Sequence, residues 1–144
     1  MRLDLYLQET RHLAARQVAI LDEAAGRLES GGSLSSLEQS GVLHALQVLT
    51  ENAIGKAKHM IKAAGQPVPV SAYDAFETLG RLDLIVKADV PHWNAIIGMR
   101  NRIVHDYLNL DIDLILELVR RGEHYFIHDF VAADYPDSMR HQAD

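Results

Sequence analysis

Arg100, Asn101 and His105 stand close together in the stretch GMRNRIVHDYLNL, residues 98–110. A histidine can take up or release a proton near neutral pH. An arginine presents a planar fork of donors that can hold a phosphate through two nitrogens. This group therefore offers proton transfer and anion binding at one place, although the residue types alone do not name a reaction.

Arg100 occupies an unusual place on the helix that this stretch predicts. With about 100° of rotation per residue, an apolar stripe falls within about 60° of Arg100. The stripe consists of Trp93, Ile96, Ile97, Ile103, Val104 and Tyr107. Because burying an unpaired guanidinium costs several kcal/mol, Arg100 needs a partner, a wet cleft or a ligand. The alternative for Arg100 is that its long stem carries the charge to solvent. The alternative for His105 is that it is found there only because the helix dipole favours a histidine near a helix C-terminus.

A second, uncharged polar stripe lies about 100–160° round the same helix. It contains Asn94, Gly98, Asn101 and His105. This composition favours a surface that another backbone or subunit approaches closely. His105 follows Asn101 by one turn, which puts the two side chains within reach of each other. Arg102 falls further round, on the side expected to be solvated.

The elements that must position these residues are all helical, because apolar residues recur at helical spacing along the chain. A first helix ends at the glycines of SGGS. A second begins with a capping box from Ser35 to Glu38 and ends before Gly65. After the linker QPVPVS, Ser71 or Asp74 caps a short helix. The motif helix is expected from about Trp93 to Tyr107, and a last helix from Asp111 or Asp113.

This pattern predicts an all-α, up-and-down bundle of four or five helices in a single domain, residues 1–144. Residues 131–144 are expected to form a polar tail, and DYPDSMRHQAD at its end is expected to fray.

The composition excludes several classes of protein. The chain has 144 residues, 48% of them hydrophobic, and no cysteine, so disulfide scaffolds and thiolate zinc sites are excluded. It has no signal peptide and no run of about 18 apolar residues, so we expect a cytoplasmic protein outside the membrane. The net charge of −6 disfavours nonspecific nucleic-acid binding. Phosphate-binding glycine motifs are absent, and no cofactor is expected.

The stretch resembles the signature of the HEPN superfamily, an arginine followed by a polar residue and then a histidine. More narrowly, Arg100, His105 and Tyr107 match the arginine, four residues, histidine, one residue, tyrosine pattern of HepT toxins. The flanking segments HALQVLTENAIGKAKHMIKAAG and YDAFETLGRLDLI also look like helices of HepT-like proteins. The resemblance covers nearly the whole chain.

The resemblance implies a HEPN-like dimer in which the motif helices of both subunits line one cleft. It implies a metal-independent endoribonuclease, the toxin of a type VII-like toxin–antitoxin pair. Its partner would be a small MNT-type nucleotidyltransferase antitoxin that silences the toxin by transferring AMP to Tyr107. The core-packing role that the apolar stripe suggests for Tyr107 is the alternative.

RNA carries its own nucleophile, the 2′-hydroxyl, so a metal-free ribonuclease needs an acid or base and a cation. We expect His105 to transfer protons, Arg100 to hold the scissile phosphate and Asn101 to orient either. Arg102 is a candidate RNA contact, with a solvated role as its alternative. The competing hypothesis is a noncatalytic helical module that docks a nucleotidyltransferase and presents its substrate.

Two further groups carry weaker signals. His124 and His128 have the spacing of a metal-binding pair, but no third ligand is evident and a surface pair is the simpler interpretation. Lys56, Lys58, His59 and Lys62 form a basic group on the second helix that suits RNA or an acidic partner, with solvated lysines as the alternative.

Overall fold

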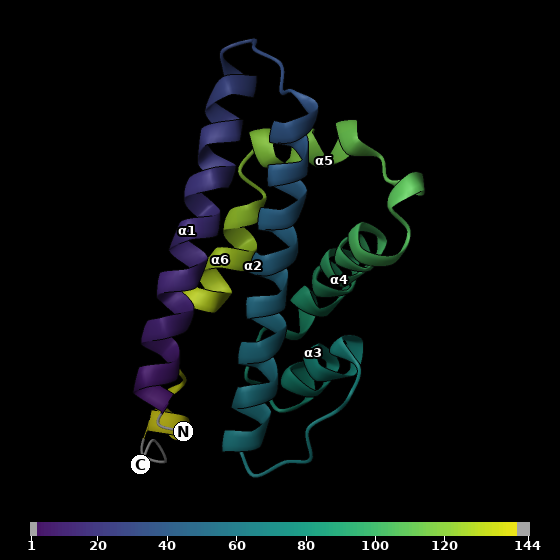
Figure 1. Cartoon of the computed structure of the whole chain (residues 1–144). Coiled ribbons are helices and arrows are strands. Elements are labelled where there is room, and N and C mark those ends of the chain that lie inside the picture. The colour runs from purple at the N-terminus through teal and green to yellow at the C-terminus, as the bar shows by residue number, and fades with distance from the viewer. Residues whose placement is uncertain (1–2, 141–144) are drawn as a thin grey trace.

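The computed structural model describes residues 3–140, and this part of the chain is helical without any strand (Figure 1). Six helices have nine residues or more, and two short 3₁₀ turns and a one-turn helix complete the order. The elements are α1 Leu3–Glu29, α2 Ser36–Ala63, α3 Ala72–Arg81, η1 Lys87–Asp89, α4 Val90–His105, η2 Tyr107–Asn109, α5 Ile112–Arg120, α6 His124–Ala132 and α7 Asp137–Arg140. The all-α prediction is confirmed, with one long helix more than expected.

Helices α1 and α2 form a long antiparallel hairpin that serves as the frame of the fold (Figure 1). The predicted capping box starts α2, because the Ser35 hydroxyl accepts from the Glu38 amide at 3.1 Å and the Glu38 carboxylate accepts from the Ser35 amide at 2.9 Å. Leu7, Val18 and Leu21 of α1 are buried against the rest of the fold, whereas Leu13 is 45% exposed.

The linker after α2 behaves as its residues predict. Gly65 adopts a φ of +75°, a left-handed conformation that glycine reaches without a steric penalty and that ends α2. Of the two predicted caps for α3, Ser71 is the correct one, because its hydroxyl accepts from the Asp74 amide at 3.3 Å. Helix α3 therefore starts at a fixed position beside α4.

Aromatic side chains hold α3, α4 and α6 together. Trp93 of α4 is buried and stacks on Phe76 of α3, with ring centroids 4.2 Å apart and planes 13° from parallel. Phe130 of α6 meets the Trp93 ring edge-on at 5.0 Å and also lies 5.6 Å from the Phe76 ring. Helix α4 is thus anchored near its N-terminal end, which sets the direction in which its last turns point.

The C-terminal part departs from the prediction of one last helix. Gly122 has a φ of +78° and separates α5 from α6, so that α6 turns back and packs against α1 and α2 (Figure 1). Tyr135 and Met139 are buried, and the expected fraying is therefore wrong for these two residues. Residues 141–144 of the expected tail lie outside the described residues.

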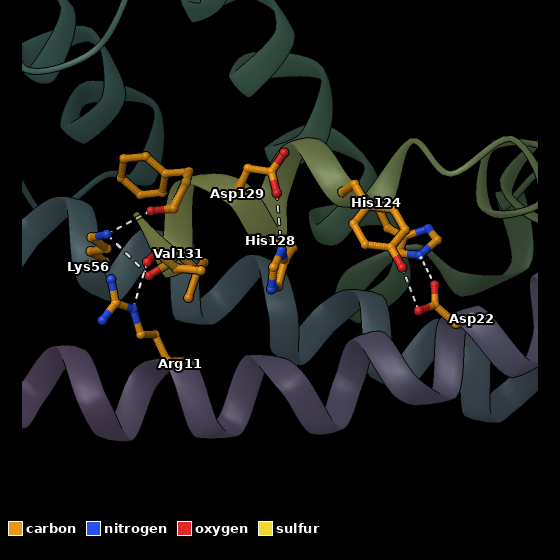
Figure 2. Close-up of polar contacts among 10 residues, drawn as sticks. Arg11, Asp22, Lys56, His124, His128, Asp129 and Val131 are labelled. Carbon is orange, nitrogen blue, oxygen red and sulfur yellow. Dashed lines mark hydrogen bonds and ion pairs between the residues drawn. The ribbon is translucent and has the colours of Figure 1, made fainter. Parts of the chain in front are cut away.

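Lys56 connects α2 to this C-terminal part (Figure 2). Its side chain is 1% exposed, and its ammonium donates to the carbonyl oxygens of Phe130 at 2.7 Å, Val131 at 3.2 Å and Ala133 at 2.6 Å. The ammonium thus satisfies carbonyls at the end of α6 that have no partner within their own helix. The solvated alternative for the basic group is therefore wrong for Lys56, and this residue cannot meet RNA.

The rest of the basic group is also partly engaged. Lys58 donates to the Val70 carbonyl at 2.7 Å, and His59 stacks on Tyr6 with centroids 4.2 Å apart. Lys62 is exposed. Across residues 3–140 no helix combines the length and apolar character that crossing a bilayer requires.

Candidate functional site

Helix α4 ends at His105, two residues earlier than predicted. Asp106 leaves the helical conformation with a φ of −142°, and Tyr107 begins the 3₁₀ turn η2. The Asn109 backbone N–H donates to the Asp106 carbonyl at 3.1 Å and closes this turn, and the Asn109 side-chain amide donates to the Asp106 carboxylate at 2.7 Å. The motif therefore spans a helix end and a turn, and Tyr107 does not continue the apolar stripe of α4.

Arg100 is half-buried on the packed side of α4. Its Nε is inaccessible to solvent and has no hydrogen-bond partner within the described chain. The neighbouring stripe residues Ile96, Ile97 and Ile103 are buried, as predicted. A charged donor beside apolar side chains without an acceptor is costly to keep. An anionic ligand would supply the acceptor that Nε lacks at this position.

Asn101 lies one residue further on and contacts α3. Its amide nitrogen donates to the Tyr73 hydroxyl at 3.5 Å. The side chains of Asn101 and His105 form no hydrogen bond with each other in the described structure, so the orientation of His105 by Asn101 stays a prediction. A Cβ added at Gly98 would lie 3.6 Å from the same Tyr73 hydroxyl, an ordinary contact distance.

Tyr73 is the residue at this site that the sequence analysis missed. It is 40% exposed in the first turn of α3 and brings a hydroxyl beside the motif. No local pattern marks it, because its role depends on the packing of α3 against α4. The one available signal was the place of Tyr73 in the first turn after the Ser71 cap, on the helix that precedes the motif helix.

The end of α4 and the turn η2 present exposed side chains. His105 is exposed, and its imidazole forms no hydrogen bond or ion pair with another described residue. Tyr107 is 56% exposed, so the alternative core-packing role for it is wrong. Val104 and Leu108 are 41% and 96% exposed. An imidazole and a phenol are thus accessible where α4 ends and η2 begins, beside two exposed apolar side chains.

Arg102 is separated from this group. It lies about 200° round the helix from Arg100. It is exposed, as predicted, and borders a cavity between α4 and α5. Arg100 and Arg102 therefore do not converge on one ligand within a single copy of the chain.

His124 and His128 do not form a metal pair. His124 is buried with its Nε2 3.0 Å from the Asp22 carboxylate, whereas His128 directs its Nδ1 to Asp129 at 3.2 Å (Figure 2). No group of three or more metal-binding side chains occurs in residues 3–140. The surface-pair alternative is also wrong for His124, which is part of a buried polar contact.

Known proteins resemble the chain along most of its length. A sequence model of the family described as ribonuclease HepT-like matches residues 10–131. The mRNA nuclease HepT of Shewanella oneidensis is 30% identical over 82 residues, which are 57% of this chain and 62% of that protein. The matched region thus spans less than two thirds of the length of that curated relative.

Two solved structures share the fold. One is a tri-AMPylated HEPN toxin of Shewanella oneidensis in complex with MNT antitoxin, with a TM-score of 0.74 and 22% identity over 90% of this chain and 98% of that one. The other is a toxin–antitoxin with AMP-PNP, with a TM-score of 0.73 and 20% identity over 88% of this chain and 97% of that one. At these identities the likeness shows the HEPN-like fold.

Proposed function

Because the chain belongs to the ribonuclease HepT-like family, we propose that it is an RNA-cleaving toxin of a toxin–antitoxin pair. The observation that carries this proposal is the half-buried Arg100, whose Nε has no acceptor among the described residues, in the last turns of α4, with the exposed His105 at the helix end and the exposed Tyr107 in the turn that follows. These groups match the motif that the family resemblance predicts, and they provide a cation and an acid–base group at an accessible place.

In the proposed reaction the 2′-oxygen of RNA attacks the adjacent phosphorus and the bond from phosphorus to the 5′-oxygen breaks. His105 takes the proton of the 2′-hydroxyl, and a second acid, His105 of the other copy, protonates the leaving 5′-oxygen. Arg100 holds the phosphate oxygens as their negative charge grows. The products are a 2′,3′-cyclic phosphate and a 5′-hydroxyl, and no metal takes part.

A second copy of the chain completes the proposed site. The net charge of −6 gives a single chain no general attraction for RNA. A two-fold pairing through the exposed side chains at the end of α4 would place two arginines and two histidines in one groove. Val104 and Leu108 supply apolar surface for such a contact.

Tyr107 is the proposed point of control. A nucleotidyltransferase antitoxin of the MNT type would bind ATP, and the Tyr107 phenol oxygen would attack the α-phosphorus. The new O–P bond forms as the bond to pyrophosphate breaks, and the phenol proton leaves to a base or to water. The exposure of Tyr107 at a chain turn supports this role. The added anion would compete with RNA for Arg100.

The test uses the purified chain, RNA and EDTA. We expect cleavage that leaves 2′,3′-cyclic phosphate ends and that stops after incubation with the antitoxin and ATP. Mass spectrometry should then find added AMP on the wild type and none on Tyr107→Phe. A chain that never cuts RNA but still gains AMP at Tyr107 would favour the noncatalytic docking module instead.

A further inference from the structure

Residues 106–110 connect α4 to α5 and project from the bundle (Figure 1). Tyr107 and Leu108 lie on this connection and are 56% and 96% exposed. Asn109, which follows them, is exposed as well. The phenol that is the proposed acceptor of AMP therefore stands on an open connection between two helices.

The apolar pattern of α4 favours a different place for Tyr107. If the helix continued, Tyr107 would follow Arg100 by seven residues and point within about 20° of the same direction. This direction is the packed side of α4, where Ile96 and Ile103 are buried. On a continued helix the phenol would thus be turned towards the core and withdrawn from a modifying enzyme.

The observed turn and a continued helix compete for the same backbone groups. In an α-helix the Asp106 carbonyl would accept from the N–H four residues on, that of Leu110. Instead it accepts from the Asn109 N–H at 3.1 Å, and the Leu110 N–H donates to the Tyr107 carbonyl at 3.2 Å. Asp106 itself has a φ of −142°, outside the helical range. Whatever stabilises this turn therefore determines where Tyr107 lies.

A side-chain hydrogen bond joins the two ends of the turn. The Asn109 side-chain amide donates to the Asp106 carboxylate at 2.7 Å, across Tyr107 and Leu108. Local hydrogen bonds of Asp and Asn side chains offer the chain an alternative to helix. Among the three hydrogen bonds of the turn, this one depends on the residue types at positions 106 and 109. It fixes the backbone of Tyr107 before any partner binds.

We propose that Asp106 and Asn109 are positioning residues that hold Tyr107 out of the apolar stripe of α4 and present its phenol to the nucleotidyltransferase. This inference rests on the proposed function. In the transfer the phenol oxygen bonds to the α-phosphorus of ATP as pyrophosphate leaves, and the phenol proton passes to a base or to water. A phenol on a backbone that is already fixed loses less conformational freedom when it reaches this geometry. Asp106 and Asn109 act through Tyr107.

Exchanging the two side chains tests the pair. Asn109→Asp sets two carboxylates against each other, so the hydrogen bond is lost. Combining it with Asp106→Asn restores the bond with donor and acceptor exchanged. Both proteins carry the same carboxylate at position 109, so that charge is present in both when they meet the transferase. Asp106→Asn alone keeps an acceptor for the Asn109 amide and is the control for the loss of the carboxylate at position 106.

The measurement is the rate of AMP addition to the purified full-length chain by the antitoxin with ATP, followed by mass spectrometry. We expect Asn109→Asp to gain AMP about tenfold more slowly than the wild type, the effect of one good hydrogen bond. The loss should persist at saturating chain concentration, because a misplaced phenol lowers kcat. The double variant and Asp106→Asn should both stay within about twofold of the wild type, because each keeps the hydrogen bond.

NMR of the isolated chain gives a second readout that needs neither the antitoxin nor RNA. The Cα chemical shifts of residues 106–109 should change in Asn109→Asp and return in the double variant. Shifts that are the same in all these proteins, Asn109→Asp modified at the wild-type rate, or a double variant as slow as Asn109→Asp would each overturn the positioning role and leave Tyr107 as the acceptor. A wild type that gains no AMP would instead contradict the proposed control at Tyr107, and this inference with it.

Discussion

The amide of Asn101 and the hydroxyl of Tyr73 lie 3.5 Å apart, and this contact joins the motif of α4 to the first turn of α3. The bond is long and partly exposed, so it contributes little to the stability of the fold. Its main effect is to restrict the side chain of Asn101, the residue that follows Arg100.

Tyr73→Phe should therefore affect activity more than stability. We expect RNA cleavage to fall about three- to tenfold, because a loosened Asn101 no longer supports the phosphate site, while the urea midpoint stays unchanged. Tyr125→Phe is the matched control, since Tyr125 is also 40% exposed but bonds to Asp22, away from the motif. Equal cleavage rates for the two variants would remove Tyr73 from the site.

Arg100 and Arg102 provide a comparison between two faces of one helix. Arg100→Ala should lower the cleavage rate about 10²- to 10³-fold, as expected for the loss of a cation that stabilises developing charge. Arg102→Ala should lower it only a few-fold, because Arg102 is exposed beside the cavity and offers at most a peripheral contact to the strand. The measurement is single-turnover cleavage of a labelled RNA. Similar losses in both variants would contradict a phosphate site centred on Arg100.

Lys56 should be the lysine of α2 on which stability depends most. Lys56→Met removes the ammonium from the Phe130, Val131 and Ala133 carbonyls, and we expect the free energy of unfolding to fall by about 2–4 kcal/mol. Lys62→Met changes an exposed lysine of the same helix and should cost under about 0.5 kcal/mol. Urea unfolding followed by circular dichroism measures both, and equal costs would show that the buried ammonium contributes nothing.

The same lysine gives the stability a pH dependence. Burial lowers the pKa of Lys56 from 10.5 to about 8. Between these values the unfolded chain binds the proton and the folded chain has released it, so stability rises with pH. The advantage of the wild type over Lys56→Met should therefore be smallest below pH 8 and grow up to about pH 10.5. A difference between the two proteins that stays flat across this window would mean that Lys56 does not titrate there.

Sequence reasoning succeeded where the signal is local. A serine three residues before a glutamate marked the start of α2, and Gly65 and Ser71 marked the ends of its linker, because each satisfies or breaks helical hydrogen bonds by itself. Arg100 stood out for a similar reason, as a charge within an apolar stripe. Its half-buried position agrees with that analysis.

The failures arose where a distant part of the chain decides the outcome. Lys56 and His124 both looked like surface residues, but carbonyls of α6 and the carboxylate of Asp22 pair with them inside the fold. Gly122 was overlooked as a helix break because its neighbours continue a helical pattern. Tyr107 was placed on α4 because the periodicity continues past the point where Asp106 and Asn109 close a turn.

The central claim is that His105 transfers protons at an RNA phosphodiester held by Arg100, and the cleavage rate of His105→Ala tests it most directly. His44→Ala is the control, since His44 is an exposed histidine of α2 outside the motif. With EDTA present and the same oligomeric state in all three proteins, His105→Ala should cut RNA about 10²- to 10⁴-fold more slowly than the wild type, the usual contribution of an acid–base group. His44→Ala should match the wild type. A His105→Ala protein that cuts RNA at the full rate would contradict the mechanism.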